Sequence, residues 1–309
     1  MINRILIRIK VVQMVYSYLL DQKGKRMMEA QKELATSLDK AYELYHYLLM
    51  LPVEFVRLQE ERLDNARNKY LPTDEDLNPN TKFVDNLFVK KISNCEMFKE
   101  FVKDNSISWA DSEISLRLML DKIVNSDIYQ EYMDKPGTSL AEDCELWRNL
   151  LKKVVFIDEN LTDALETKSV YWNDDLDTVG TFVLKTIKRF EEEGYEELLP
   201  KYKDDEDRLF AEKLFVNAVN NKDEYMKLID MFVSKDSWET ERLAFMDIVV
   251  LLVAIAELEK VPSVPTKVTM NEFIEIAKCY STNKSGQFVN GILNSIINYL
   301  KKEGRLFKN

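Results

Sequence analysis

Two short segments at opposite ends of the chain carry the residues best suited to binding a charged ligand. Arg4 and Arg8 are one helical turn apart, so they share one edge of a predicted helix, and Tyr18 lies near that edge. Lys284 precedes Phe288 by one turn at the start of the last predicted helix. Basic side chains and free backbone N–H groups at a helix start favour a phosphate, so both segments are candidates for anion binding.

The aromatic ring in "KSGQFVNGIL", residues 284–293, has two interpretations. Phe288 lies at the edge of the apolar stripe of this helix, where a ring beside basic and small residues can stack on a nucleic-acid base, worth about 1–3 kcal/mol. Alternatively, the ring packs against a neighbouring helix. The residue pattern leaves both open, and it predicts that Ser285 caps the helix.

Catalytic and metal-binding patterns are missing from the sequence. The chain has one histidine, His46, so no Ser-His or Cys-His pair can be proposed, and no Cys/His set has zinc spacing. Neither GxGxxG nor GxxxxGK[ST] occurs. The acidic runs at 174–177 and 204–207 are typical of helix starts rather than metal sites. We therefore predict no enzyme, no cofactor and no metal.

The charge is distributed unevenly along the chain. Net charge is −11, but residues 1–27 carry six Lys and Arg against Asp21 alone, and residues 260–309 carry eight against three Glu. Such asymmetry can mark an anion-binding face on an acidic body, although two solvated basic ends would give the same count.

Composition predicts a helical protein of the cytoplasm. Only 7 Gly and 7 Pro occur among 309 residues, and no uncharged apolar run is long enough to span a membrane. The first twelve residues contain Arg4, Arg8 and Lys10 without a small-residue cleavage site, so we expect no signal peptide. Cys95, Cys144 and Cys279 are far apart, which indicates reduced thiols.

The strongest helical signals lie near the two ends. Residues 3–20 have apolar residues at a 3.6-residue period on more than one side, which predicts a largely buried helix. The segment "RLAFMDIVVLLVAIAELEK", residues 242–260, predicts an apolar helix at the centre of a bundle. Pro262 and Pro265 end that helix, and two more helices follow.

The region between the ends, residues 27–204, is acidic and helical. Trp109, Trp172 and Trp238 each follow an aromatic-led segment, at steps of 63 and 66 residues, which suggests a repeated helical module. We expect these tryptophans to be core anchors.

The motif "VPTKVTMNEFIEIAK…SGQFVNGIL" resembles the signature of the transcription antitermination factor NusB family. The C-terminal likeness covers about 100 residues, and a weaker one covers about 20 at the N-terminus. The matching positions are Val264, Pro265, Lys267, Val268, Asn271, Glu272, Ala277, Lys278, Phe288, Val289, Asn290 and Gly291, with Asp247, Leu251, Ala254, Glu257 and Leu258 upstream and Arg4, Arg8, Gln13 and Tyr16 in the first helix.

The resemblance implies an all-α fold with a NusB-like helical bundle core and additional inserted helical modules. Residues 1–26 would form the first helix of that core and residues 205–309 the rest. Residues 27–204 would be an inserted acidic helical region with possible repeats.

The resemblance also implies a function. NusB-like domains bind a short boxA-like single-stranded RNA together with ribosomal protein NusE, join the RNA polymerase antitermination complex and promote ribosomal RNA transcription. They can also form homodimers. By resemblance, the RNA-binding residues are Arg4, Arg8, Tyr18, Lys284, Gln287 and Phe288, and the partner-binding residues are Asp247 and Glu257.

Several positions depart from the family pattern. Ile5 and Leu6 stand where the family has a denser arginine cluster, and Leu252 where it has an arginine. Lys284 replaces an acid and Gln287 a lysine. The net charge of −11 and the thinned arginine cluster motivate an alternative, a protein–protein interaction scaffold on the NusB fold that has lost RNA binding, whereas the lysine at position 284 favours phosphate binding. The RNA sequence that is read, the role of residues 27–204 and the oligomeric state stay open.

Overall fold

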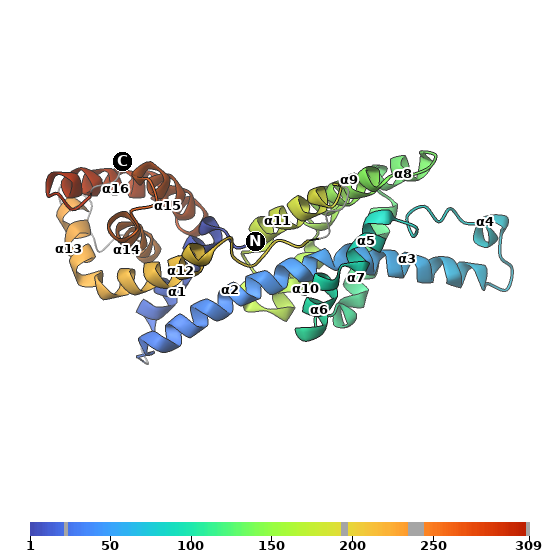
Figure 1. The fold of residues 1–309 in the computed structure, drawn as a ribbon, viewed down its shortest axis with the longest axis horizontal. Helices are drawn as coiled ribbons and strands as arrows, with labels where there is room; N and C mark the ends of the chain where they lie inside the picture. Colours follow the sequence, from blue (N-terminus) through green and yellow to red (C-terminus); the bar gives the residue numbers. More distant parts are fainter. Residues whose placement is uncertain (22–23, 193–196, 234–243, 307–309) are drawn as a thin grey trace. The chain divides into compact units, whose positions relative to one another are not determined.

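The protein is all-α, as predicted. The computed structural model describes all residues except 22–23, 193–196, 234–243 and 307–309. In the described part no β-strand forms (Figure 1). One isolated bridge joins Ile2 to Tyr202. None of the described helices is long and apolar enough to cross a bilayer.

The chain divides into two compact units. We call residues 2–38 and 202–309 the terminal unit, and Met1 with residues 39–201 the middle unit. Residues 27–38, which the sequence analysis placed in the inserted region, cluster with the terminal unit because α2 (Met27–Leu49) is one continuous helix that contributes to both. The middle unit carries 34 acidic and 21 basic residues, whereas the terminal unit carries 20 acidic and 22 basic residues. The acidity of the protein therefore belongs to the middle unit.

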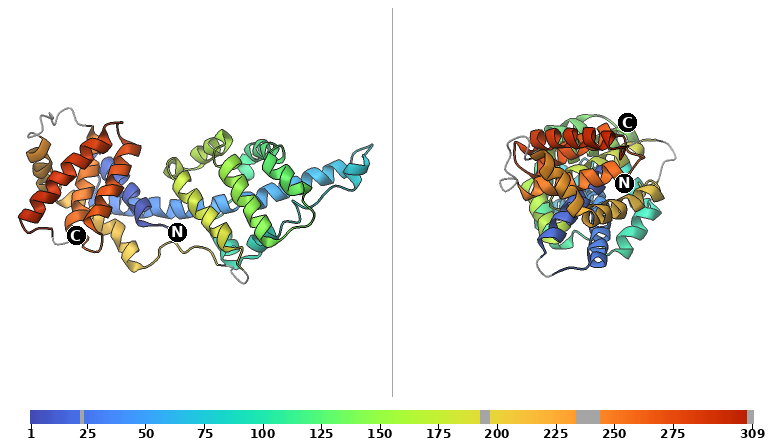
Figure 2. Two further views of the ribbon diagram at one scale, coloured as in Figure 1. Left: turned by 90° about the horizontal axis from the view of Figure 1, so that it is seen from above. Right: turned by 90° about the vertical axis from the view of Figure 1, so that its left-hand side faces the viewer.

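In the terminal unit the apolar helix lies at the centre, as predicted. Helix α14 is buried along almost its whole length and packs against α1, α12, α13, α15 and α16. Figure 2 gives two further views of this bundle. The side chain of Asn3 caps the first helix by accepting from the backbone N–H of Leu6 at 2.9 Å. The helices of this unit besides the first part of α2 are α1 (Arg4–Leu20), α12 (Asp205–Asn220), α13 (Lys222–Val233), α14 (Phe245–Lys260), α15 (Thr266–Tyr280) and α16 (Ser285–Lys302).

The middle unit is a second helical assembly built on the second part of α2. It contains α3 (Leu51–Arg67), α4 (Asp74–Leu77), α5 (Leu87–Asn94), α6 (Glu96–Asp104), η1 (Ala110–Ser112), α7 (Glu113–Val124), α8 (Asp127–Asp134), α9 (Leu140–Leu150), η2 (Leu151–Val155), α10 (Glu159–Lys168), η3 (Val170–Trp172) and α11 (Leu176–Arg189). Segment η2 is a π-helical turn that continues α9.

Two of the three evenly spaced tryptophans anchor the middle unit, as predicted. Trp109 stacks on Tyr47 at 3.9 Å between ring centroids, and its Nε1–H donates to the Tyr47 carbonyl at 3.0 Å. Trp172 donates to the Lys40 carbonyl at 2.8 Å. Both rings are buried and both bind backbone oxygens of α2, so this helix organises the unit. Trp238 lies outside the described residues.

The single histidine is a core residue of the middle unit. His46 is 1% exposed, its ring stacks on Phe101 at 3.6 Å, and its Nδ1–H donates to the Tyr42 carbonyl at 2.9 Å. Burial disfavours the imidazolium and lowers the pKa of His46 to about 4, although the bond to the Tyr42 carbonyl opposes the shift.

This shift predicts a loss of stability in mild acid. Folding favours neutral His46, so its contribution is complete above pH ~6.5 and falls as the pH drops toward 4, by roughly 2 kcal/mol between pH 7 and 5. Urea unfolding at pH 7 and at pH 5 gives the free energy of unfolding of the native protein and of His46→Leu, which has no imidazole to titrate. Between these two pH values the native protein should lose roughly 2 kcal/mol more of that free energy than the variant does. An equal loss in both proteins would contradict it, as would a histidine NMR signal that titrates near pH 6.5.

Candidate RNA and partner interface

A buried ion pair joins the first helix to the centre of the terminal unit. Arg8 Nε donates to Glu257 Oε2 at 2.7 Å and Arg8 Nη2 donates to Oε1 at 2.9 Å. Thr269 Oγ1 also donates to Oε1, at 2.8 Å. Arg8 is 2% exposed and Glu257 is fully buried, so this contact fixes α1, α14 and α15 to one another.

A second charged cluster surrounds Arg4. Its Nε donates to Asp207 Oδ1 at 2.7 Å, and its Nη2 lies 3.1 Å from Glu206 Oε1, so α1 is tied to the first turn of α12. Phe210 supports both arginines, with its ring centroid 5.2 Å from Arg4 Cζ and 5.5 Å from Arg8 Cζ. Burial lowers the pKa of Arg4, but the pairs with Asp207 and Glu206 outweigh it and raise the pKa overall.

These contacts determine how accessible the two predicted RNA-binding arginines are to a phosphate. They share one helix edge, as expected from their spacing, and that edge faces Phe210 of α12. Arg8 has its guanidinium enclosed, whereas Arg4 keeps about a quarter of its side chain exposed. A phosphate can therefore approach Arg4 from solvent, and reaching Arg8 requires the ion pair to open.

The start of α16 presents one face to solvent and buries another. Lys284 and Gln287 are exposed, while Phe288 is only 7% exposed. The covered ring agrees with the packing interpretation of Phe288. Ser285 does not cap the helix as predicted: Lys284 is the N-cap residue and makes no side-chain bond there. Ser285 Oγ instead accepts from the Thr282 backbone N–H at 3.0 Å, because it is turned back into the preceding loop.

The remaining predicted residues are at least partly covered. Tyr18 is half-buried and meets Phe215 edge-on at 5.8 Å between centroids. Asp247, in the first turn of α14, is 4% exposed, and its Oδ1 accepts no hydrogen bond from the described residues. Of the partner-binding pair, Glu257 is engaged by Arg8 and Thr269.

The two predicted RNA-binding segments belong to helices with different neighbours. Helix α1 packs on α12 and α14, and α16 packs on α13, α14 and α15 (Figure 1). The structure thus brings Arg4, Arg8 and Glu257 together, and it places Lys284 and Gln287 on another helix that shares only α14 as a major neighbour.

Sequence reasoning missed the acidic partners of Arg4. Asp207 and Glu206 were interpreted only as helix-start charges, and their helix does carry acids through its first turn. Their reach to Arg4 depends on the packing of α1 on α12, which residue spacing does not reveal. The sequence does contain one sign of this arginine-binding surface: the acidic start of the helix is followed one turn later by an aromatic residue, Phe210.

Comparison with known proteins places the terminal unit in a family. The NusB family model matches residues 179–298, which include α12 to α15 and most of α16, together with most of α11 at the end of the middle unit. "Transcription antitermination protein NusB" of Salinibacter ruber (strain DSM 13855 / M31) is 37% identical over 141 residues, which is 46% of this chain and 81% of that protein. The chain belongs to the NusB family.

Two further NusB proteins show similar identity. The protein of Chloroherpeton thalassium (strain ATCC 35110 / GB-78) is 42% identical over 100 residues, 32% of this chain and 47% of the relative. That of Listeria monocytogenes serotype 4a (strain HCC23) is 38% identical over 93 residues, 30% of this chain and 71% of the relative. No solved structure matches the chain. The NusB assignment supports a role in transcription antitermination, and most of the middle unit lies outside the family match.

The buried ion pair predicts a specific stability pattern. Arg8→Met leaves the Glu257 carboxylate buried without its countercharge, so we expect a loss of about 3–5 kcal/mol in the free energy of unfolding. Arg8→Met/Glu257→Leu removes both charges and should recover much of that loss. Urea denaturation followed by circular dichroism measures both. A loss under about 1 kcal/mol for the single variant would show that the pair is not a major constraint.

Proposed function

We propose that this NusB-family chain is an RNA-binding adaptor of transcription antitermination, which binds a boxA-like single-stranded RNA together with the ribosomal protein NusE. The family match carries the proposal, because it covers the helices that hold the Phe-Val-Asn-Gly motif. Further support comes from charge. The terminal unit has slightly more basic than acidic residues, which suits a phosphate-bearing partner better than the acidic middle unit.

Within the proposed interface the predicted residues take different roles. Lys284 and Gln287 are exposed and can contact RNA without rearrangement. Arg4 would be reached from its exposed side, and Tyr18 lies farther along the same helix. Arg8 and Phe288 would act by holding α1 and α16 in place, since both are buried. Asp247 and Glu257 are buried, so they stay candidates for NusE binding only in an indirect role, by holding α14 in position.

A protein-only scaffold on the NusB fold is the second candidate. Two observations favour it: the charged groups of Arg4 and Arg8 are already paired with carboxylates, and the ring of Phe288 is covered. The two functions predict different effects of salt on RNA binding. For an RNA-binding adaptor, each phosphate contact on a single strand adds about 0.7 to the steepness with which log affinity falls as log salt concentration rises. A protein-only scaffold would show no selective RNA binding at any salt concentration.

The exposed lysine provides the test. Fluorescence anisotropy with a labelled boxA-type RNA, at 50 and 200 mM salt and with or without NusE, should show selective binding over a scrambled RNA. Lys284→Ala should weaken binding at both salt concentrations and reduce the salt slope by about 0.7. Lys302→Ala removes the same charge from the last turn of α16 and is the matched control, with unchanged binding expected.

Two outcomes would overturn the adaptor function. One is equal affinity for boxA-type and scrambled RNA under all conditions while NusE is still bound, which leaves the scaffold. The other is an equal loss of RNA affinity in Lys284→Ala and Lys302→Ala, which would show that RNA responds to the overall positive charge of α16 rather than to a contact at its start. Phe288→Ala is unsuitable as the main variant, because removing a buried ring costs about 3–5 kcal/mol of stability by itself.

A further inference from the structure

A groove in the middle unit has the features of a protein-binding site. It has a volume of about 190 Å³, lies between α8 and α9 and extends to η2 and to the segment before α5. This volume is below the roughly 300–1,000 Å³ of pockets that enclose a small-molecule ligand, so the groove suits one side chain rather than a cofactor. Its lining residues also lie outside residues 179–298, which match the NusB family.

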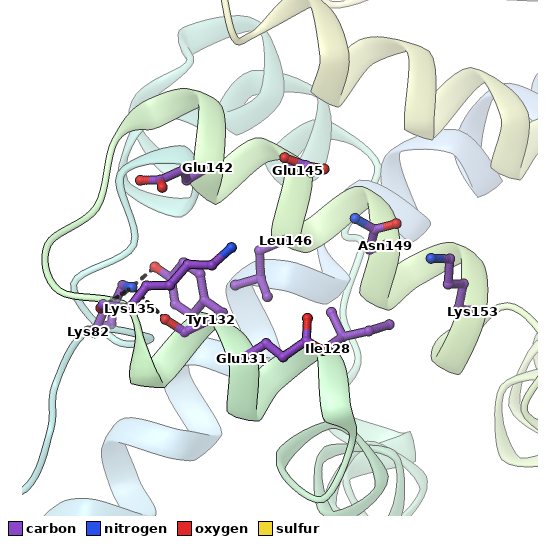
Figure 3. A pocket seen from close by; sticks show the side chains of 10 residues that line it. All are labelled: Lys82, Ile128, Glu131, Tyr132, Lys135, Glu142, Glu145, Leu146, Asn149 and Lys153. Atoms are coloured by element: carbon purple, nitrogen blue, oxygen red, sulfur yellow. Dashed lines mark hydrogen bonds between the residues drawn. The ribbon is translucent and has the colours of Figure 1, made fainter.

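The groove has an apolar floor and charged rims. Figure 3 shows Leu146 between the helices with Ile128 beside it. Glu145 of α9 stands on one rim, and Glu131 of α8 on the other. Leu146 is buried, Ile128 is partly exposed, and both glutamates are exposed. Lysines occur toward the two ends, with Lys135 at one and Lys153 at the other.

Internal bonds hold the walls of the groove in place. Lys82 donates to the carbonyl of Lys135 at 2.8 Å and to that of Tyr132, and its ammonium lies 4.1 Å from the Tyr132 ring centroid. Tyr132 in turn donates its hydroxyl proton to buried Asp143 of α9 at 2.6 Å. Asp143 also accepts from the backbone N–H of Leu87 at 2.5 Å. The end of α8 is therefore fixed to α9 before any ligand arrives, which favours binding by reducing its ordering cost.

The rim carboxylates are available to an incoming group. Glu131 and Glu145 are exposed and form no ion pair with any of the described residues, and the Ser139 hydroxyl donates to Glu142 at 3.2 Å. No set of His, Cys, Asp or Glu among the described residues has the arrangement of a metal site. The glutamates thus flank an apolar strip from opposite sides, a geometry that suits a cation carried on an apolar stem better than a bare ion.

We propose that the groove binds an arginine side chain of a protein partner. Its aliphatic stem would lie on Leu146 and Ile128, and its planar guanidinium would pair with a carboxylate of the rim, Glu131 or Glu145. The 34 acidic against 21 basic residues of the middle unit attract a basic protein, and Lys135 and Lys153 favour acidic residues flanking that arginine.

The simplest probe of the groove is Nα-acetyl-arginine amide. NMR titration of the ¹⁵N-labelled full chain should give saturable shifts confined to amides of α8 and α9, with a dissociation constant on the order of 10 mM, because exposed ion pairs are individually weak. Nα-acetyl-citrulline amide has the same shape without the charge and should shift these amides little. Glu131→Gln/Glu145→Gln should weaken arginine binding at least threefold.

A matched pair of substitutions controls for net charge. Glu159→Gln/Glu166→Gln removes two exposed carboxylates from α10, away from the groove, and should leave arginine binding unchanged. Equal shifts with the citrulline probe, or equal weakening by both variants, would overturn the proposal. So would larger groove shifts with inorganic phosphate than with the arginine probe, because the lysines would then define an anion site. Unfolding curves of both variants establish that they are folded.

Discussion

The terminal unit depends on one charge being compensated. Arg8 is inside the bundle, and a buried guanidinium without a partner costs several kcal/mol, so Glu257 must face it. The bidentate geometry fixes orientation as well as distance, and the bond from Thr269 extends the constraint to α15. The apolar contacts of α14 determine that the helices pack, and the ion pair determines which faces meet.

The same constraint changes the interpretation of the arginines at the N-terminus. A cluster of basic residues on one helix edge suggests an exposed binding surface, yet Phe210 covers this edge and carboxylates of α12 and α14 neutralise it. Internal pairing leaves the exposed positive charge to residues such as Lys284, which directly precedes the second part of the family motif.

Much of the fold could be predicted from the sequence, because periodicity reports local burial. The central position of α14 follows from its unbroken apolar run, and Trp109 and Trp172 are core anchors, as expected for large apolar side chains. Pairings across the chain could not be predicted: Arg8 and Glu257 are 249 positions apart, and nothing in either local pattern names the other. The position of Phe288 at the edge of its stripe was ambiguous for the same reason, since its burial depends on a neighbouring helix. The groove between α8 and α9 needs the geometry of two helices that residue spacing does not give.

The arrangement of the terminal unit has a consequence for biosynthesis. The arginine of its first helix is synthesised 249 residues before the partner carboxylate, a delay of roughly 12–50 s at ordinary elongation rates. Residues 39–201 are contiguous, so the middle unit can complete its core within that interval. The apolar face of α1 meanwhile has no α12 or α14 to cover it. The nascent chain therefore carries a hydrophobic helix without its final packing partners throughout this interval, and the terminal unit can close only after the middle unit has been made.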